Sequence, residues 1–158
     1  MTKGARETLS TARRREQHAA AVRQDADPAD AFIVDDEPGI CKFVALALQP
    51  LGVKSECFQS AEGVLAALEH GQPDIIYLDI SLKGSDAIDV IRALGRMHYG
   101  GVVQLMSGNS MQLLEDVRRV GARHGLNMRQ PLEKPFRADA VHQAAMSMPY
   151  EGQAETTL

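Results

Sequence analysis

The sequence predicts an α/β fold in which five parallel strands form one sheet with helices on both faces. Short apolar stretches alternate along the chain with longer segments whose apolar residues recur at helical spacing. Such an alternation is typical of strand–helix units joined by right-handed crossovers. In the middle of the chain, Ile75–Leu78 is a continuous apolar run, as a strand covered on both faces requires. Together these observations favour a doubly wound (βα)5 arrangement.

The positions of the elements follow from the apolar runs and from the residues that begin or end helices. Strands are expected at Ala31–Val34, Val53–Phe58, Asp74–Leu78, Val102–Met106 and Asn127–Leu132. Helices are expected at residues 40–51, 61–70, 85–97, 110–124 and 137–148. Ser60 is placed to cap the second helix, while Gly52 and Gly125 are placed to end the first and the fourth. Residues 31–148 are therefore expected to form one domain.

The two ends of the chain differ from this domain in composition. Residues 1–30 carry six basic residues followed by three aspartates, and their few large apolar residues are Leu9 and Val22. Such a segment cannot bury an apolar face of its own, so we expect a flexible N-terminal arm there. Residues 149–158 are expected to be a flexible C-terminal tail. A docking arm for an acidic partner, or a helix that pairs two copies, is the alternative for the first segment.

Bulk properties exclude several classes of function. The formal net charge of -4 argues against a nucleic-acid binder, which usually carries a basic excess. No apolar run approaches the roughly 18 residues of a membrane span, and no signal peptide is apparent. We therefore expect a cytoplasmic protein with neither nucleic acid nor membrane as a partner.

The two cysteines give no metal site or disulfide framework. Cys41 and Cys57 are sixteen residues apart and no further cysteine accompanies them, which is not a zinc-ligand spacing. Free cysteine is among the most buried residue types. We expect both to be small, reduced core residues.

Polar side chains follow four of the five expected strands. Asp35 and Asp36 follow the first strand, Asp79 the third, Ser107 the fourth and Lys134 the fifth. In parallel α/β sheets, ligands bind beyond the carboxyl ends of the strands. An acidic cluster, a lone carboxylate, a hydroxyl and an amine are therefore expected to meet at one edge of the sheet.

These residue types suit the transfer of a phosphoryl group to a carboxylate. Several carboxylates make the oxygen-rich site that Mg²⁺ prefers, and the metal shields an incoming phosphoryl group from an anionic nucleophile. Asp79 is the candidate nucleophile. Ser107 can donate a hydrogen bond to a phosphoryl oxygen, and Lys134 can place a positive charge on another.

The same residues give the chain a resemblance to the receiver domains of bacterial response regulators. The matching motifs are Val-Asp-Asp-Glu-Pro at 34–38, Leu-Asp at 78–79, Met-Ser-Gly at 106–108 and Glu-Lys-Pro-Phe at 133–136. The resemblance covers about residues 30–148. It implies a flavodoxin-like or CheY-like fold and a phosphoprotein that signals in a two-component system or phosphorelay, rather than an enzyme.

The resemblance also implies roles for individual residues. Asp36 and Asp79 would bind Mg²⁺ directly, Asp35 would act through water, and the Ser81 backbone carbonyl would complete the protein ligands. A phosphohistidine on a sensor histidine kinase or a phosphotransfer protein would phosphorylate Asp79.

The remaining implications concern the response to phosphorylation. Ser107 would move toward the new phosphoryl group and Lys134 would pair with it. The Lys134–Pro135 peptide bond would be cis, which is rare outside X-Pro bonds. A homodimer through the last helix and the fifth strand would be typical of the family, and the downstream protein target stays unknown.

The sequence departs from the family pattern at three positions. Lys83 and Ala87 stand where the loop after the phosphorylated Asp usually has Pro and Gly, and we expect Lys83 to be exposed. Pro131 stands where an aromatic residue usually acts as a switch. It is tolerated if the fifth strand lies at the sheet edge, but output must then use other motions.

Three functions compete at this point. The favoured one is a stand-alone receiver, because too little chain follows Phe136 for an output domain. The second is an aspartyl-phosphate hydrolase of the haloacid dehalogenase type, whose Asp-x-Asp motif is missing at residues 79–81. The third is a pseudo-receiver that keeps the fold as an interaction module, which the departure at Pro131 keeps open.

Overall fold

Strand–helix units follow one another in the computed structural model, which describes residues 29–82, 87–108 and 111–146. The strands are β1 (Ala31–Val34), β2 (Ser55–Phe58), β3 (Ile75–Asp79), β4 (Val102–Ser107), β5 (Asn127–Met128) and β6 (Leu132–Glu133). The helices are α3 (Pro38–Leu48), which a 3-10 turn at Gln49–Leu51 continues, α4 (Ala61–Leu68), α5 (Ala87–Arg96), α6 (Met111–Arg123) and α7 (Ala138–Met146). The predicted tail, Lys83 and all of the predicted arm except Ala29 and Asp30 lie outside the described residues.

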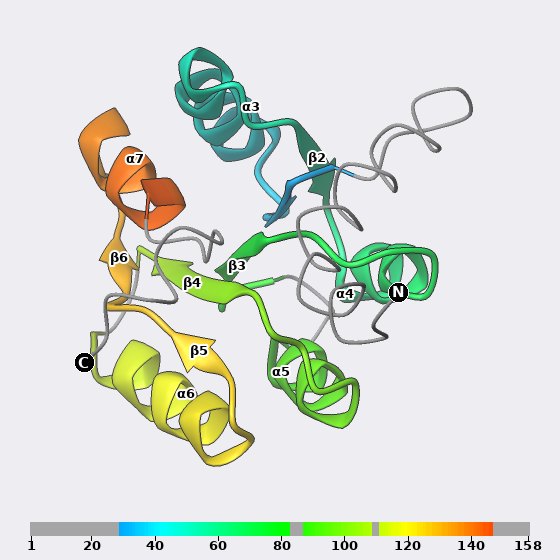
Figure 1. The fold of residues 1–158 in the computed structure, drawn as a ribbon. Coiled ribbons are helices and arrows are strands. Elements are labelled where there is room, and N and C mark those ends of the chain that lie inside the picture. Colours follow the sequence, from blue (N-terminus) through cyan, green and yellow to red (C-terminus); the bar gives the residue numbers. More distant parts are fainter. Residues whose placement is uncertain (1–28, 83–86, 109–110, 147–158) are drawn as a thin grey trace, which may run out of the picture. The chain divides into compact units, whose positions relative to one another are not determined.

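The strands form one parallel sheet in the order β2-β1-β3-β4-β5, and β6 also pairs with β4. Because β1 lies between β2 and β3, the strand order reverses direction at this point (Figure 1). In such sheets the crevice at the reversal is the usual ligand site. The predicted doubly wound fold is confirmed, and it directs attention to the carboxyl ends of β1 and β3.

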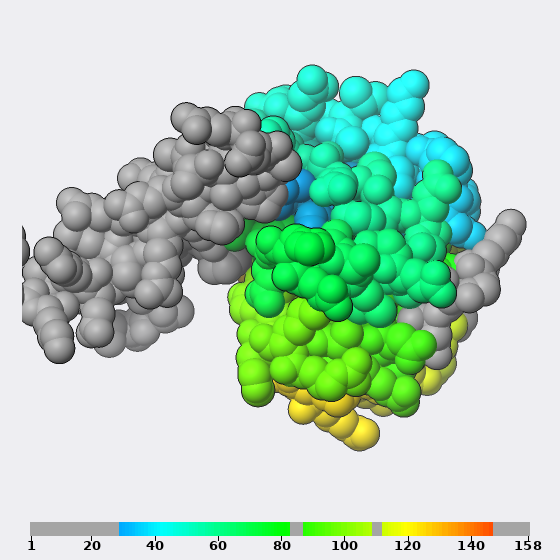
Figure 2. Space-filling model, turned by 90° about the vertical axis from the view of Figure 1, so that its right-hand side faces the viewer, coloured from blue at the N-terminus to red at the C-terminus, as the bar shows by residue number. Residues whose placement is uncertain are grey.

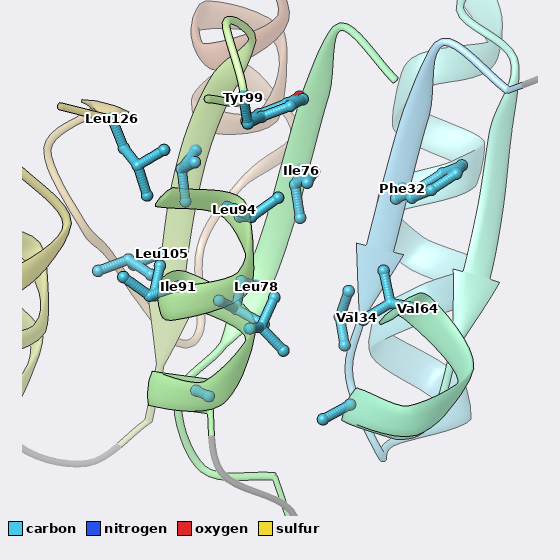
Figure 3. Packing of buried hydrophobic residues seen from close by; sticks show 14 of the residues in the cluster. Phe32, Val34, Val64, Ile76, Leu78, Ile91, Leu94, Tyr99, Leu105 and Leu126 are labelled. Atoms are coloured by element: carbon cyan, nitrogen blue, oxygen red, sulfur yellow. The ribbon is translucent and has the colours of Figure 1, made fainter. Parts of the chain in front are cut away.

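Helices cover both faces of the sheet (Figure 1), with α3 and α7 on one face and α4, α5 and α6 on the other. The strand β3 contributes to the cores on both faces of the sheet. Ile75 and Tyr77 point toward α3 and α7, whereas Ile76 and Leu78 point toward α4, α5 and α6. This explains its continuous apolar sequence. Figure 3 shows side chains of α5 against β3 and β4, and α4 and α5 lie side by side on this face (Figures 1 and 2). No helix among the described residues has the length and apolar character needed to cross a membrane.

The residues predicted to begin and end helices do so. The Ser60 hydroxyl accepts a hydrogen bond from the Gly63 backbone N–H at 3.1 Å and so caps α4. Gly52 and Gly125 adopt left-handed φ values of 70° and 78° after α3 and α6. Glycine takes this conformation without the steric cost that a Cβ atom imposes.

The fifth strand differs from the single continuous strand that the sequence predicted. It consists of β5 and β6, which pair with different parts of β4. Val103 pairs with Met128, the last residue of β5, and Met106 pairs with Leu132, the first residue of β6. Three residue steps along β4 therefore match four steps along the fifth strand. One extra residue is therefore accommodated as a bulge next to Pro131, where the missing N–H of proline is tolerated.

A polar side chain in β4, Gln104, spans this bulge. Its Nε2 group donates to the carbonyl oxygen of Gln130 at 2.7 Å and to that of Leu105 at 3.1 Å. The residue is only 2% exposed, and buried polar groups need such partners. A side-chain donor thus reaches the carbonyl that directly precedes Pro131.

Replacing Gln104 with leucine is expected to lower the free energy of unfolding by about 1–2 kcal/mol, because a partly buried carbonyl loses its donor. Urea unfolding followed by circular dichroism measures the change. Gln112→Leu, at an exposed position of α6, is the matched control and is expected to stay within about 0.5 kcal/mol of wild type. Equal effects of the two variants would contradict the bridging role.

Candidate functional site

The carboxyl ends of four strands bring the predicted residues to one edge of the sheet. Asp35 follows β1 directly, Asp79 ends β3, Ser107 ends β4 and Lys134 follows β6. Parallel strands end at a common edge, so residues up to a hundred positions apart in the chain become neighbours.

Three carboxylates form the centre of this site. One carboxylate oxygen each of Asp35, Asp36 and Asp79 lies within 4.8 Å of the other two. Asp35 and Asp79 are buried, whereas Asp36 is half-buried. A cluster of carboxylates with one member open to water fits the oxygen ligands and retained waters of Mg²⁺.

Short turns fix the orientation of the two buried carboxylates. Asp35 Oδ1 accepts a hydrogen bond from the backbone N–H of Glu37 at 2.9 Å, and Asp79 Oδ1 accepts one from that of Ser81 at 3.0 Å. Aspartate forms such turns with the backbone two residues on. In both residues Oδ1 is thereby held by the chain itself, while Oδ2 lies close to Lys134.

Lys134 is the cation of the site. Its Nζ atom lies 2.7 Å from Asp35 Oδ2, 3.5 Å from Asp79 Oδ2 and 3.9 Å from Glu37 Oε1. The lysine side chain is 12% exposed. The Glu37 contact was not predicted, although this residue adjoins the aspartate pair in the sequence.

The backbone around Lys134 is tied to the end of β4. The backbone N–H of Lys134 donates to the Ser107 carbonyl oxygen at 2.8 Å, and the Lys134–Pro135 peptide bond is cis, as the resemblance predicted. The hydroxyl oxygens of Ser107 and Ser81 are 3.4 Å apart. Sequence reasoning assigned only the carbonyl of Ser81 a role, because nothing in the sequence indicated that its side chain would meet Ser107.

The crowding of charge changes the acidity of both central groups. Burial raises the pKa of Asp79, and the negative charges of Asp35 and Asp36 act in the same direction. The Ser81 N–H and Lys134 oppose this rise without cancelling it. For Lys134, burial lowers the pKa, but the hydrogen bond to Asp35 and the nearby carboxylates outweigh it, so the pKa is raised overall. The lysine therefore stays charged beside the aspartates.

Two of the three positions that depart from the family pattern lie within the described residues. Ala87 is buried at the start of α5, and Pro131 is buried between β5 and β6. Pro131 brings no aromatic ring to this region, and the carbonyl of its neighbour Gln130 accepts a hydrogen bond from Gln104.

Relatives of this chain are found by sequence. The nitrogen assimilation regulatory protein NtrX of Azorhizobium caulinodans is 33% identical over 114 residues, which is 71% of this chain and 24% of that protein. TcrX, a probable transcriptional regulatory protein of Mycobacterium tuberculosis, is 29% identical over 85 residues, 54% of this chain and 36% of that protein. The chain thus spans about a quarter to a third of the length of these curated relatives.

Solved structures agree with the fold, and a family model matches most of the chain. The receiver domain of NtrX from Brucella abortus is 29% identical, with a TM-score of 0.63 over 74% of this chain and 95% of that one. The Vibrio cholerae chemotaxis protein CheY4 is 18% identical, with a TM-score of 0.65 over 77% of this chain and 98% of that one, and shares the fold. The sequence model of the response regulator receiver domain matches residues 31–146. The chain belongs to the response regulator receiver domain family.

Proposed function

We propose that Asp79 accepts a phosphoryl group from a phosphohistidine of a sensor histidine kinase or phosphotransfer protein, and that a partner protein binds the phosphorylated form. The observation that carries this proposal is the placement of Lys134 Nζ 3.5 Å from Asp79 Oδ2, beside Asp35 and Asp36. A carboxylate nucleophile thus lies close to a cation and to two further potential metal ligands, an arrangement that suits phosphoryl transfer.

Three side chains act on the phosphoryl group itself. A carboxylate oxygen of Asp79 forms the bond to phosphorus while the phosphorus–nitrogen bond of the donor breaks, and the bonding electrons stay on the imidazole. Lys134 places its positive charge against the phosphoryl oxygens. The Ser107 hydroxyl donates a hydrogen bond to another phosphoryl oxygen.

Asp35, Asp36 and Asp79 would hold Mg²⁺. The Ser81 carbonyl as a further ligand, and water between Asp35 and the metal, stay predictions. When bound, the metal supplies positive charge that lets an anionic phosphoryl group approach the Asp79 carboxylate. Burial raises the Asp79 pKa, and the negative charges of Asp35 and Asp36 add to this rise. A divalent cation would offset both effects.

The test is phosphorylation by a small donor. The chain is incubated with acetyl phosphate and Mg²⁺ and run on a phosphate-affinity gel. A shifted band is expected for wild type and for Asp89→Asn, an exposed aspartate of α5, but not for Asp79→Asn or in the presence of a chelator. A shift that survives Asp79→Asn would overturn the assignment of the acceptor.

A pseudo-receiver that acts as an interaction module without phosphorylation is the second candidate. The observation that favours it is Pro131, which leaves no aromatic ring at the usual switch position. If acetyl phosphate and phosphoramidate both fail to shift the wild-type band, and beryllofluoride with Mg²⁺ leaves the amide NMR spectrum unchanged, this second function is the correct one.

Other expectations stay predictions: a cytoplasmic location, action without an output domain, the absence of nucleic-acid and membrane partners, a homodimer, and a flexible arm and tail on a domain of residues 31–148. The expected action without an output domain would set this chain apart from those relatives. The part that they share with it is only 24% of NtrX and 36% of TcrX.

A further inference from the structure

The two cysteines, which were expected to share the core, lie in different surroundings. Cys41 on α3 is buried and Cys57 on β2 is exposed. The expectation for Cys57 was wrong because β2 is the edge strand of the sheet, where side chains have fewer neighbours.

The fold nevertheless brings the two residues together. Cys57 pairs in register with Ile33 of β1, and adjacent strands are about 4.8 Å apart. The Cys41 Sγ atom lies 3.8 Å from the carbonyl oxygen of the same Ile33. Register partners in a parallel sheet point to the same face, and Ile33 points into the core that contains Cys41. Cys57 is therefore directed toward the face that α3 covers.

The acidity of Cys41 agrees with a position near Cys57. Burial raises the pKa of Cys41 to about 12, and a hydrogen bond with the Cys57 side chain is the next largest cause. The structure records both cysteines as free thiols. An exposed thiol close to a second, buried thiol is the arrangement of an oxidisable cysteine with a resolving partner.

From this geometry we propose that Cys41 and Cys57 are a redox-active pair that closes to an intramolecular disulfide under hydrogen peroxide. The exposed Cys57 sulfur attacks the peroxide O–O bond, which gives a sulfenic acid and one water. The Cys41 sulfur then attacks the sulfenic sulfur, the S–O bond breaks, and the hydroxyl leaves with the Cys41 proton as a second water. The cysteines lose two electrons, which reduce the peroxide to two waters.

The bond would join α3 to the edge strand β2. Cys41 is in α3, which begins directly after the acidic residues 35–37, and its sulfur lies 3.7 Å from the Asp35 carbonyl oxygen. The proposal concerns the thiols alone and does not depend on phosphorylation of Asp79. A disulfide that forms only under an oxidant has the character of a redox sensor rather than a structural crosslink.

The sequence makes the test direct, because Lys42 and Lys54 lie between the cysteines. Trypsin separates Cys41, in the peptide of residues 24–42, from Cys57, in the peptide of residues 55–83. The reduced full-length chain is treated with hydrogen peroxide, blocked with N-ethylmaleimide in denaturant and digested. Mass spectrometry is expected to find most of the chain as these two peptides joined by a disulfide that dithiothreitol reverses.

Controls separate the proposal from general oxidation. The joined pair is expected to form about tenfold or more slowly in the urea-unfolded chain, because the fold raises the effective concentration of the thiols. In Cys57→Ser, the buried Cys41 is expected to resist peroxide. In Cys41→Ser, Cys57 is expected to be oxidised without the joined pair. Circular dichroism checks that the variants fold, and Cys41→Ala replaces Cys41→Ser if needed.

The wild-type chain decides the proposal by itself. If peroxide converts Cys57 to sulfinic acid while Cys41 remains open to N-ethylmaleimide, the two sulfurs do not pair and the proposal is wrong. Disulfides found only between two chains would overturn it equally.

Discussion

Replacing Lys134 with methionine is expected to lower the free energy of unfolding by about 3 kcal/mol when a chelator removes divalent metal. The substitution keeps most of the side-chain length but removes the positive charge that lies 2.7 Å from Asp35 and 3.5 Å from Asp79. Asp35 is fully buried, and a buried charge that loses its partner costs about 3–5 kcal/mol. The lower end applies because Asp36 leaves the site partly open to water.

Magnesium is expected to reduce this loss. A divalent cation at the three carboxylates replaces the missing charge, so the variant should gain more stability from Mg²⁺ than wild type does. Urea unfolding with a chelator and with excess MgCl2 measures both differences. Lys42→Met, at an exposed position of α3, is the control and should change the free energy by no more than about 0.5 kcal/mol.

The same loss with and without Mg²⁺ would show that Lys134 acts through packing rather than charge. It would also count against a metal site at these carboxylates. In the phosphorylation assay, Lys134→Met should accept the phosphoryl group more slowly, because no fixed cation faces the phosphoryl oxygens.

Replacing Gly101 with alanine is expected to cost about 3 kcal/mol of stability without affecting the site. A Cβ atom there would overlap the phenol group of Tyr99 and lie 2.6 Å from the Asp74 carbonyl oxygen. The Tyr99 hydroxyl donates to the Pro73 carbonyl at 2.8 Å, and the residue is only 3% exposed. The ring cannot move aside without losing this bond and its packing, which makes the overpacking costly.

Gly100 is the matched control, because a Cβ atom added there would meet nothing within 4 Å. Gly100→Ala should stay within about 0.5 kcal/mol of wild type. Thermal and urea unfolding, followed by circular dichroism, compare the two variants. Similar losses of stability in the two variants would mean that the Tyr99 ring moves aside at little cost, which would contradict the prediction. Below its unfolding transition, Gly101→Ala should still be phosphorylated, since Gly101 precedes β4 whereas the site follows it.

The sequence by itself determined the parallel sheet, the cap and the glycines at the helix ends, and the polar residues that follow the strands. Ile75–Leu78 had to be a doubly covered strand because no polar side chain interrupts it, and Ser60 and Gly52 act on backbone groups close to them in the chain. The polar residues at the strand ends were predictable for a related reason. Once the strands are known to be parallel, their carboxyl ends must meet, so Asp35, Asp79 and Lys134 become neighbours.

Only the tertiary structure decided the features that depend on contacts between distant segments. The bulge in the fifth strand arises from register with β4, and Gln104 spans it from the neighbouring strand. Cys57 is exposed because its strand lies at the sheet edge, yet its register partner Ile33 lies beside Cys41. Lys134 lies closer to Asp35 than to Asp79. Local patterns fix which residues form an element, but register, edge position and the aim of a long side chain come from packing between elements.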